Sequence, residues 1–150
     1  MDNRLYNVYL SRSYLSNLKL YVMNGNYFTF KELTTTDTGL HNSVSCDSHL
    51  ANLATLWNTL NYIRERFGAP IIVNSAYRTD AVNKQVGGSK RSLHKQGRAA
   101  DIRPADSSLL DELWQLLTSE KDCYSELIKY ETFIHIALKL WKYYYTLSRI

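Results

Sequence analysis

The segment SKRSLHKQGRAADI, residues 89–102, contains two side chains of the kinds that bind metal ions. His94 follows a basic, polar stretch, and Asp101 lies in a short apolar run between Ala100 and Ile102. A lone carboxylate is costly to bury in such a run unless another group compensates its charge. The position of Asp101 therefore predicts a partner for its side chain elsewhere in the chain.

His94 and His135 are candidate partners for Asp101. Gly97 permits a sharp turn that would bring His94 back beside Asp101. His135 lies in the run FIHIA, where strand alternation places it on the opposite face from its isoleucine neighbours. Two histidines and one aspartate leave a fourth position open for water, which is the ligand pattern of catalytic zinc. Zinc in such a site would neutralise Asp101 and lower the pKa of its bound water to about 7, which generates a nucleophile.

Two simpler interpretations of the same residues stay open. A histidine in a strand is more often a hydrogen-bonded core or surface residue than a metal ligand, and this applies to His135. Asp101 could instead form a salt bridge with one of three arginines: Arg78, Arg98 or Arg103. The other histidines, His41 and His49, lie in polar sequence, and we expect both at the surface.

The clearest predicted element is a helix that precedes this segment. Apolar residues recur at steps of three and four between Leu50 and Phe67, which is the pattern of an amphipathic helix. Asp47 or Ser48 would cap its start, and Gly68 would end it. A second helix is predicted after this one, over residues 106–117, where leucines recur at helical spacing.

Short apolar runs predict an antiparallel sheet. The expected strands are PIIVNSAYR (70–78), GRAADIRP (97–104), SELIKYE (125–131) and TFIHIALKL (132–140). A helical turn and a glycine loop are expected between the first two strands, and Asn24-Gly25 predicts a type I′ hairpin near the N-terminus. Helices and strands in this order, with short connections, favour an α+β fold.

The composition is that of one globular domain with a mildly basic surface. The chain has 150 residues, 45% of them hydrophobic, and a formal net charge of +4, which suits an anionic partner. Cys46 and Cys123 lack CxxC spacing and indicate neither a disulfide framework nor a cysteine metal site, although a disulfide between them stays open. The stretch MDNRLYNVYLSRSYL lacks the apolar segment of a signal peptide, and no run approaches the ~20 apolar residues of a membrane span. We therefore expect synthesis in the cytoplasm.

Three segments together resemble the zinc D-alanyl-D-alanine peptidase family: SAYRT, NKQVGGSKRSLHKQGRAADI and FIHI. The combination S-x-H-x-x-G-x-A-x-D followed by H-I carries the resemblance, which is closer to the short branch common in phages and prophages. YFTFKELT and LANLATLWNTLNYIRERFGAPIIV extend it over roughly residues 27–138. It implies a hedgehog-like α+β fold, with a small antiparallel sheet flanked by helices around a zinc cleft. Residues 1–26 would be an N-terminal extension of this single domain, and residues 139–150 an aromatic tail.

The resemblance implies a role for each residue that matches the family's motifs. The zinc ligands fall on His94, Asp101 and His135. Arg78 matches a position that holds the substrate or the developing oxyanion, a role that suits a guanidinium. Its alternative role is a structural salt bridge to Asp101 or Asp80.

The general base departs from the family's pattern. Many members have a glutamate three residues before the last histidine, where this chain has Thr132. Glu131 is the nearest carboxylate, so we predict it as the base, with Glu126 as the substitute. A regular strand would keep Glu131 on the face of His135, and a turn there would still leave it within reach of the metal. Either glutamate could instead be a solvated surface residue. Ser92 matches a serine that lines the family's pocket, or else it only caps the loop.

The function implied by the resemblance is hydrolysis of peptidoglycan stem or cross-bridge peptides by a zinc metallopeptidase, of the D-Ala-D-Ala carboxypeptidase or endopeptidase type. The alternative is a non-catalytic wall- or protein-binding module that retains the zinc site, which the displaced glutamate favours. We expect a monomer that binds the peptidoglycan peptide and neither nucleic acid nor a membrane. Without a signal peptide, the chain fits a phage or prophage endolysin that reaches the wall after release by another route.

Overall fold

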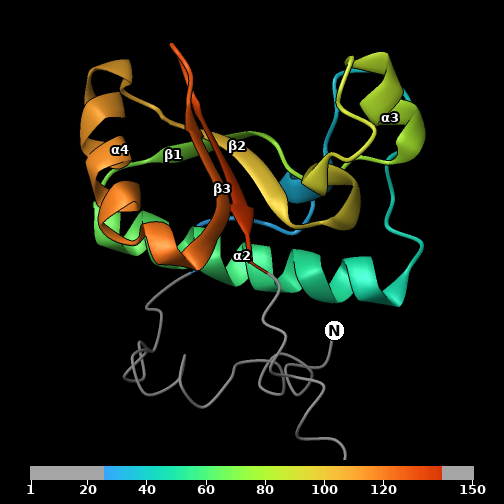
Figure 1. Cartoon of the computed structure of the whole chain (residues 1–150), viewed down its shortest axis with the longest axis horizontal. Helices are drawn as coiled ribbons and strands as arrows, with labels where there is room; N and C mark the ends of the chain where they lie inside the picture. Colours follow the sequence, from blue (N-terminus) through green and yellow to red (C-terminus); the bar gives the residue numbers. More distant parts are fainter. Residues whose placement is uncertain (1–25, 140–150) are drawn as a thin grey trace, which may run out of the picture. The chain divides into compact units, whose positions relative to one another are not determined.

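The computed structural model describes residues 26–139. The elements, in chain order, are η1 (Glu32–Thr34), α2 (Asp47–Phe67), β1 (Ile71–Ser75), α3 (Asp80–Gln85), η2 (Leu93–Gln96), β2 (Ala99–Pro104), η3 (Ser107–Leu109), α4 (Leu110–Ser119), η4 (Lys121–Cys123), β3 (Tyr124–Lys129) and β4 (Ile134–Leu138) (Figure 1). The predicted α+β class is confirmed. The hairpin predicted at Asn24-Gly25 and the C-terminal tail lie outside the described residues.

The long helix α2 confirms the amphipathic pattern. Its inner face is fully buried through Leu53, Leu56, Leu60 and Ile63. The helix ends as predicted at Gly68, which adopts φ 75° and donates its backbone N–H to the Arg64 carbonyl. The predicted cap was wrong, because the helix begins at Asp47 with Cys46 in the N-cap position and without a side-chain capping bond. The Ser48 hydroxyl instead hydrogen-bonds Cys46 Sγ at 2.9 Å.

The second predicted helix is also present. It begins with the 3-10 turn η3, where Asp106 is the N-cap and its Oδ1 accepts a hydrogen bond from the backbone N–H of Ser108 at 3.0 Å. The chain then continues as α4, whose Leu113 and Leu117 are fully buried. Residues 26–139 contain no helix that is long and apolar enough to cross a bilayer. Within the same residues, no disulfide joins the two cysteines.

The four predicted strands form one antiparallel sheet in the order β1-β2-β4-β3. The central pair, β2 and β4, places Asp101 directly opposite His135. The register of β1 shifts between Val73 and Ser75, so that Ser75 pairs with Asp101. The last two strands are shorter than predicted, because β3 ends at Lys129 and residues 131–133 belong to the connection.

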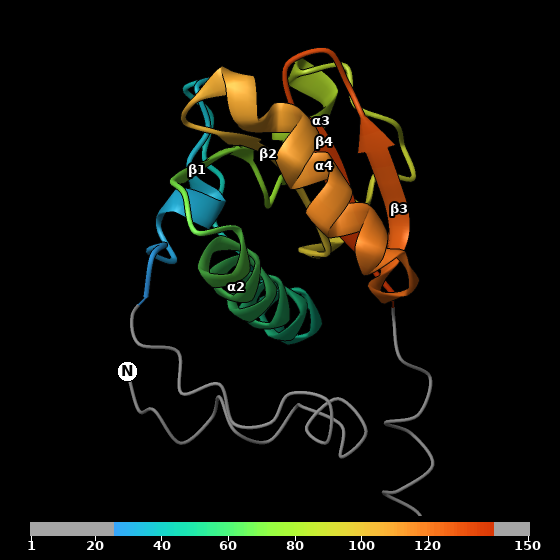
Figure 2. The same ribbon diagram turned by 90° about the vertical axis from the view of Figure 1, so that its left-hand side faces the viewer.

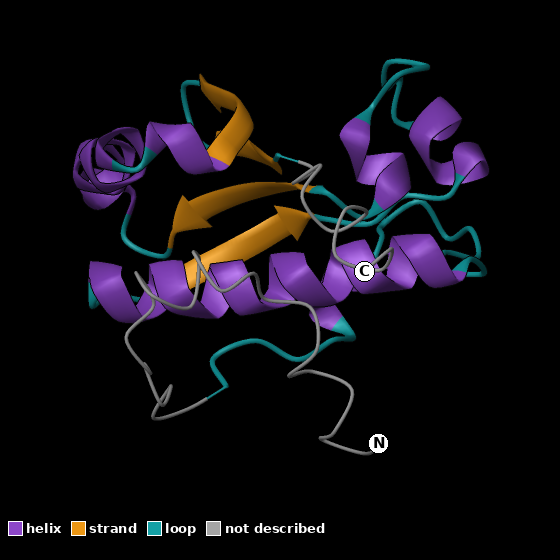
Figure 3. Ribbon diagram, turned by 60° about the horizontal axis from the view of Figure 1, so that its bottom comes forward, coloured by secondary structure: helices purple, strands orange, loops and turns teal. Residues whose placement is uncertain are grey.

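The two faces of the sheet have different environments. On one face, apolar side chains of the two central strands are fully buried in the core: Ala100, Ile102, Ile134 and Ile136. They pack with the buried leucines of α2 and α4, which lie beside the sheet (Figures 2 and 3). Strand alternation turns Asp101 and His135 to the opposite face, as predicted for His135.

Candidate metal and catalytic site

One row of side chains crosses the sheet on the face opposite the core. The register makes Ser75 of β1, Asp101 of β2, His135 of β4 and Ile128 of β3 successive neighbours. Residues paired across antiparallel strands lie on the same face, with Cβ atoms about 5 Å apart. The sheet therefore brings together residues of four strands, of which only β3 and β4 are separated by a short connection.

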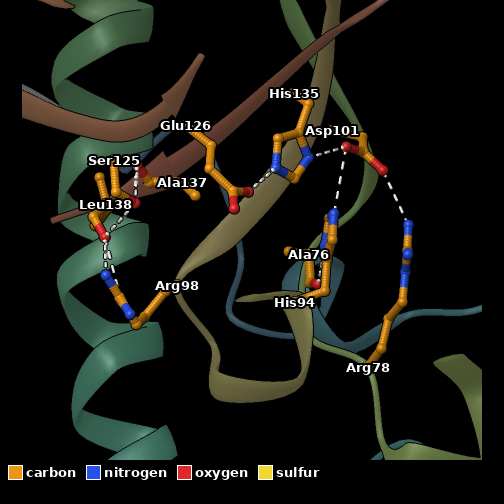
Figure 4. Close-up of polar contacts among 10 residues, drawn as sticks. All are labelled: Ala76, Arg78, His94, Arg98, Asp101, Ser125, Glu126, His135, Ala137 and Leu138. Carbon is orange, nitrogen blue, oxygen red and sulfur yellow. Dashed lines mark hydrogen bonds and ion pairs between the residues drawn. The ribbon is translucent and has the colours of Figure 1, made fainter. Parts of the chain in front are cut away.

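His94 joins this row from the turn that precedes β2. It lies in η2, and Gly97 ends that turn with φ 71° before the chain enters β2. A Cβ atom on Gly97 would lie 2.7 Å from the backbone oxygen of His49, so the close approach also requires glycine. The turn places His94 Nε2 3.3 Å from Asp101 Oδ1, as predicted (Figure 4).

The hydrogen-bond partner of His94 determines where its proton lies. The side chain is only 3% exposed, and Nδ1 is 2.6 Å from the Ala76 carbonyl oxygen. A carbonyl can only accept, so Nδ1 carries the proton, and in the neutral ring Nε2 presents its lone pair to Asp101. A lone pair and a carboxylate oxygen at this distance repel each other unless a cation or a proton lies between them. His94 Nε2 is therefore suited to bind a metal ion.

His135 lies between two carboxylates. Its Nδ1 is 2.8 Å from Asp101 Oδ1, and its Nε2 is 2.8 Å from Glu126 Oε2 (Figure 4). Burial disfavours the charged ring, but hydrogen bonds to Asp101 and Glu126 outweigh burial and raise the pKa of His135 above its ordinary value. In the metal-free protein these contacts stabilise a proton on each ring nitrogen.

Asp101 uses its two oxygens for different partners. Oδ1 faces the two histidines, and Oδ2 accepts a hydrogen bond from Arg78 Nη2 at 2.9 Å. Burial is the largest single effect and would raise the pKa of Asp101, but hydrogen bonds and charge from His135 and His94 lower it well below its ordinary value. The carboxylate is therefore ionised and available as an anionic ligand.

Within residues 26–139, Arg78 is the only one of the three arginines considered as salt-bridge partners that contacts Asp101. Arg98 donates to the Leu138 carbonyl, and Arg103 donates to the Asn74 side chain. The salt bridge and a metal-ligand role are compatible, because one oxygen of Asp101 forms the salt bridge and the other faces the histidines.

The donor set of the cluster fits a zinc ion. His94, Asp101 and His135 each offer one ligand atom, and these atoms all lie within 4.8 Å of one another. Nitrogen and oxygen ligands at tetrahedral zinc lie about 3.3–3.5 Å apart, and the His94–Asp101 distance is 3.3 Å. Histidine ligands of metals usually donate their second ring N–H to a carbonyl or a carboxylate. Ala76 and Glu126 supply such acceptors here.

The structure places the two candidate bases in different cavities. Glu126 lines a cavity of about 320 Å³ whose lining includes the three candidate ligands. Glu131 lines a separate surface cavity of about 450 Å³ that contains none of them. A regular strand through Glu131 is contradicted, because β4 begins only at Ile134 and strand alternation does not extend to residue 131.

Arg78 and Ser92 line the same cavity as Glu126. The Arg78 side chain is 14% exposed, and its Nε donates to Ser75 Oγ at 2.9 Å, in addition to the bond from Nη2 to Asp101. Ser92 precedes η2 but makes no side-chain capping bond there. The geometry therefore favours a position at the cavity for Ser92 over the capping role.

Asn42, which no sequence motif marks, positions the site. Its side chain is buried, and its Nδ2 donates to the carbonyls of Thr34 at 3.0 Å and Tyr77 at 2.8 Å. Its Oδ1 accepts from the Thr79 N–H at 2.8 Å, so the bonds hold the backbone on both sides of Arg78. Asn42 lies in a polar stretch, where composition predicts an exposed loop, and no periodic pattern distinguishes it from its neighbours.

The fold and the site define a class of protein: a small α+β domain with a His-Asp-His cluster suited to zinc, at a cavity that also holds a carboxylate and a guanidinium. Residues 26–137 match the family model described as Peptidase M15, and the chain therefore belongs to the peptidase M15 family. This match confirms the resemblance to zinc D-alanyl-D-alanine peptidases. No curated protein matches the chain.

Proposed function

We propose that the chain is a zinc-dependent hydrolase of peptide bonds in bacterial peptidoglycan, made in the cytoplasm and active after release to the wall. The observation that supports it is the convergence of His94, Asp101 and His135 at one cavity in a chain of the M15 family. These three residues would hold zinc, which supplies a Lewis acid and an activated water when bound.

Glu126 is the general base in this proposal, in place of Glu131. Its carboxylate lines the cavity beside His135, and its side chain is 43% exposed, so it has room to turn toward a bound peptide. A base must lie within hydrogen-bond reach of the proton that it accepts, and Glu131 lines the other cavity. The carboxylate of Glu126 would accept a proton from water and return it to the leaving amine.

Arg78 has two tasks in this proposal. Its Nη2 holds Asp101 so that Oδ1 faces the histidines. Its remaining N–H groups would bind the carbonyl oxygen of the scissile bond as negative charge develops on it. Ser92, which lines the same cavity, would donate a hydrogen bond to the peptide.

The second candidate is a non-catalytic wall- or protein-binding module with a retained metal site. The hydrogen bond between Glu126 and His135 favours it, because a carboxylate that only orients a ligand does not act as a base. The two candidates agree on zinc and differ on bond cleavage.

Hydrolysis of purified peptidoglycan by the zinc-loaded full chain tests the proposal. Newly released amino groups are counted and the amino end is identified, with a His135→Ala variant as the control. We expect amine release that stops with a chelator and returns with added zinc. Zinc and wall binding without amine release would overturn the peptidase in favour of the module, and a chain that binds no zinc would overturn both.

A further inference from the structure

The charges of the described domain are separated between its two ends. Residues 26–139 contain equal numbers of basic and acidic side chains, counting lysine and arginine against aspartate and glutamate. Residues 81–100 contain five lysines or arginines and no aspartate or glutamate, whereas residues 105–126 contain six acidic residues and one lysine. Helix α3 leads into the first segment and α4 belongs to the second, and the two helices lie at opposite ends of the domain (Figure 1). One end of the domain is therefore basic and the other acidic.

The exposed charges of the basic end are concentrated on one tight turn. The Ser92 N–H donates to the Ser89 carbonyl at 3.0 Å, which closes a β-turn with Lys90 and Arg91 at its two central positions. The Lys95 ammonium donates to the Lys90 carbonyl at 3.2 Å, so a third positive charge lies against the same turn. We call Lys90, Arg91 and Lys95 the basic turn.

The backbone of the basic turn is held by α3. Asn83 of this helix is buried, and its Nδ2 donates to the Ser89 carbonyl at 2.9 Å. The Asn83 backbone carbonyl accepts from the Gly88 N–H at 2.8 Å, and a Cβ atom on Gly88 would lie 2.1 Å from Asn83 Oδ1, so the loop packs directly on the helix. Ser89 Oγ also accepts from the backbone N–H of Arg91 at 3.1 Å. These bonds preorganise the turn, which lowers the entropic cost of binding a ligand there.

Two charges of the basic turn have no partner among the described residues. Lys90 and Arg91 are exposed, and neither side chain forms an ion pair or a hydrogen bond with another residue of 26–139. Asp80, which pairs with Lys95 at 2.7 Å, is the only carboxylate within these residues that contacts the turn. Like charges gathered in this way repel one another, and a bound anion would relieve the repulsion.

We propose that the basic turn binds a polyol-phosphate polymer, a chain of phosphodiesters joined by small alcohols, and thereby orients the domain on an anionic wall. A guanidinium binds phosphate through two parallel hydrogen bonds, and an ammonium binds it as a point charge. The acidic end of the domain is repelled by the same polymer, so the basic end approaches it. Residues 81–100 contain no Phe, Trp or Tyr on which a base could stack, which favours such a polymer over nucleic acid.

The basic turn borders the candidate metal site without filling it. Ser89, Arg91 and Ser92 line the cavity of the metal cluster, whereas Lys90 and Lys95 do not. A polymer bound at the turn would therefore bring the cavity to the wall and leave it open for a peptide. This inference goes beyond the proposed function, because the binding requires neither zinc nor bond cleavage.

Binding of the full chain to labelled poly(glycerol phosphate), followed by fluorescence anisotropy at low salt, tests the proposal. Lys90→Gln/Arg91→Gln should bind about 5- to 30-fold more weakly than the parent, the range expected when two cations lose contact with an anionic surface. Lys31→Gln/Lys121→Gln is the matched control, because it removes the same net charge at exposed positions outside the turn. It should change binding less than about twofold, and added salt should reduce the difference between the two double variants. Substitutions at such exposed positions rarely affect folding.

The possible outcomes separate this inference from the proposed function. Equal weakening in the two double variants would overturn the inference, because net charge alone would then account for binding, and so would parent-like binding by the turn variant. Tighter binding of poly(glutamic acid) or of single-stranded DNA, with the same dependence on the basic turn, would overturn the phosphodiester polymer in favour of a carboxylate polymer or a nucleic acid. Turn-dependent binding of poly(glycerol phosphate) by a chain that hydrolyses no peptidoglycan would support the inference and overturn the peptidase.

Discussion

The two faces of strands β2 and β4 differ sharply, although they are built from alternating residues of the same few segments. Ala100, Ile102 and Ile136 on one face are fully buried among apolar neighbours. Asp101 and His135 on the other face are partly exposed and each contacts an oppositely charged group. The first face gains stability from the removal of apolar surface from water, at roughly 25 cal/mol per Å².

The comparison shows why a charged cluster can lie one residue away from the core. Both oxygens of Asp101, both ring nitrogens of His135 and Nδ1 of His94 have polar partners, so the cost of their desolvation is offset locally. Changes on the core face should therefore affect folding, and changes on the other face should affect metal binding and catalysis.

The largest effect is expected on the cluster face, from substitution of Glu126, the proposed base. Glu126→Gln should lower kcat by about 10²- to 10⁴-fold, because the amide still accepts a hydrogen bond from His135 but does not accept a proton. Zinc content should stay unchanged, which metal analysis of the same preparation checks. The matched change Glu131→Gln should leave kcat close to that of the parent chain, because Glu131 lines the other cavity. If only Glu131→Gln loses activity, Glu131 is the general base, as predicted from the sequence.

The core face should respond through stability instead. Ile102→Ala should lower the free energy of unfolding by about 2–5 kcal/mol, because it leaves a cavity beside fully buried neighbours. Denaturant unfolding measures the change, and Ile102→Val, with an expected loss of about 0.5–1.5 kcal/mol, is the conservative control. Folded Ile102→Ala should still bind zinc in the same ratio as the parent. A variant that folds but has lost its zinc would show that the two faces are coupled.

A smaller effect is expected from pH on the stabilisation of the fold by zinc. Because the pKa of His135 is raised, protonation of its ring stabilises the metal-free fold. This stabilisation is complete below the ordinary pKa of about 6.5 and is lost as pH rises through the raised pKa of His135. Zinc must displace a proton from the ring, so its binding strengthens as pH rises. The difference in Tm between the zinc-loaded and metal-free chain should be larger at about pH 8 than at about pH 6. Equal differences at the two pH values would contradict this coupling.

The elements and the ligand cluster were predictable because they depend on local patterns. The three- and four-residue spacing identified α2, and strand alternation placed His135 on the face opposite its isoleucine neighbours. Gly97 marked the turn that returns His94 to Asp101. These features follow from backbone geometry, which short stretches of sequence determine.

The position of Glu126 beside His135 was not predictable from the same patterns. Sequence distance to His135 favoured Glu131, but the strand ends before that residue is reached, and pairing with β3 brings Glu126 to the ring instead. Cross-strand neighbours depend on the register of two strands, which alternation within one strand does not define. The hydrogen bonds of Asn42 to three distant backbone groups also depend on tertiary structure, so no local pattern predicts them.

The zinc content of the purified full chain decides whether His94, Asp101 and His135 form a metal site. We expect one zinc per chain in the parent, the same ratio in Glu126→Gln, and loss of the metal in Asp101→Ala and in His94→Ala. The folding of each variant is checked by circular dichroism, so that a loss of zinc can be distinguished from a loss of structure. A folded parent chain that binds no zinc under metal-replete conditions would contradict the zinc site, and Asp101 would then be held by Arg78 and the histidines alone.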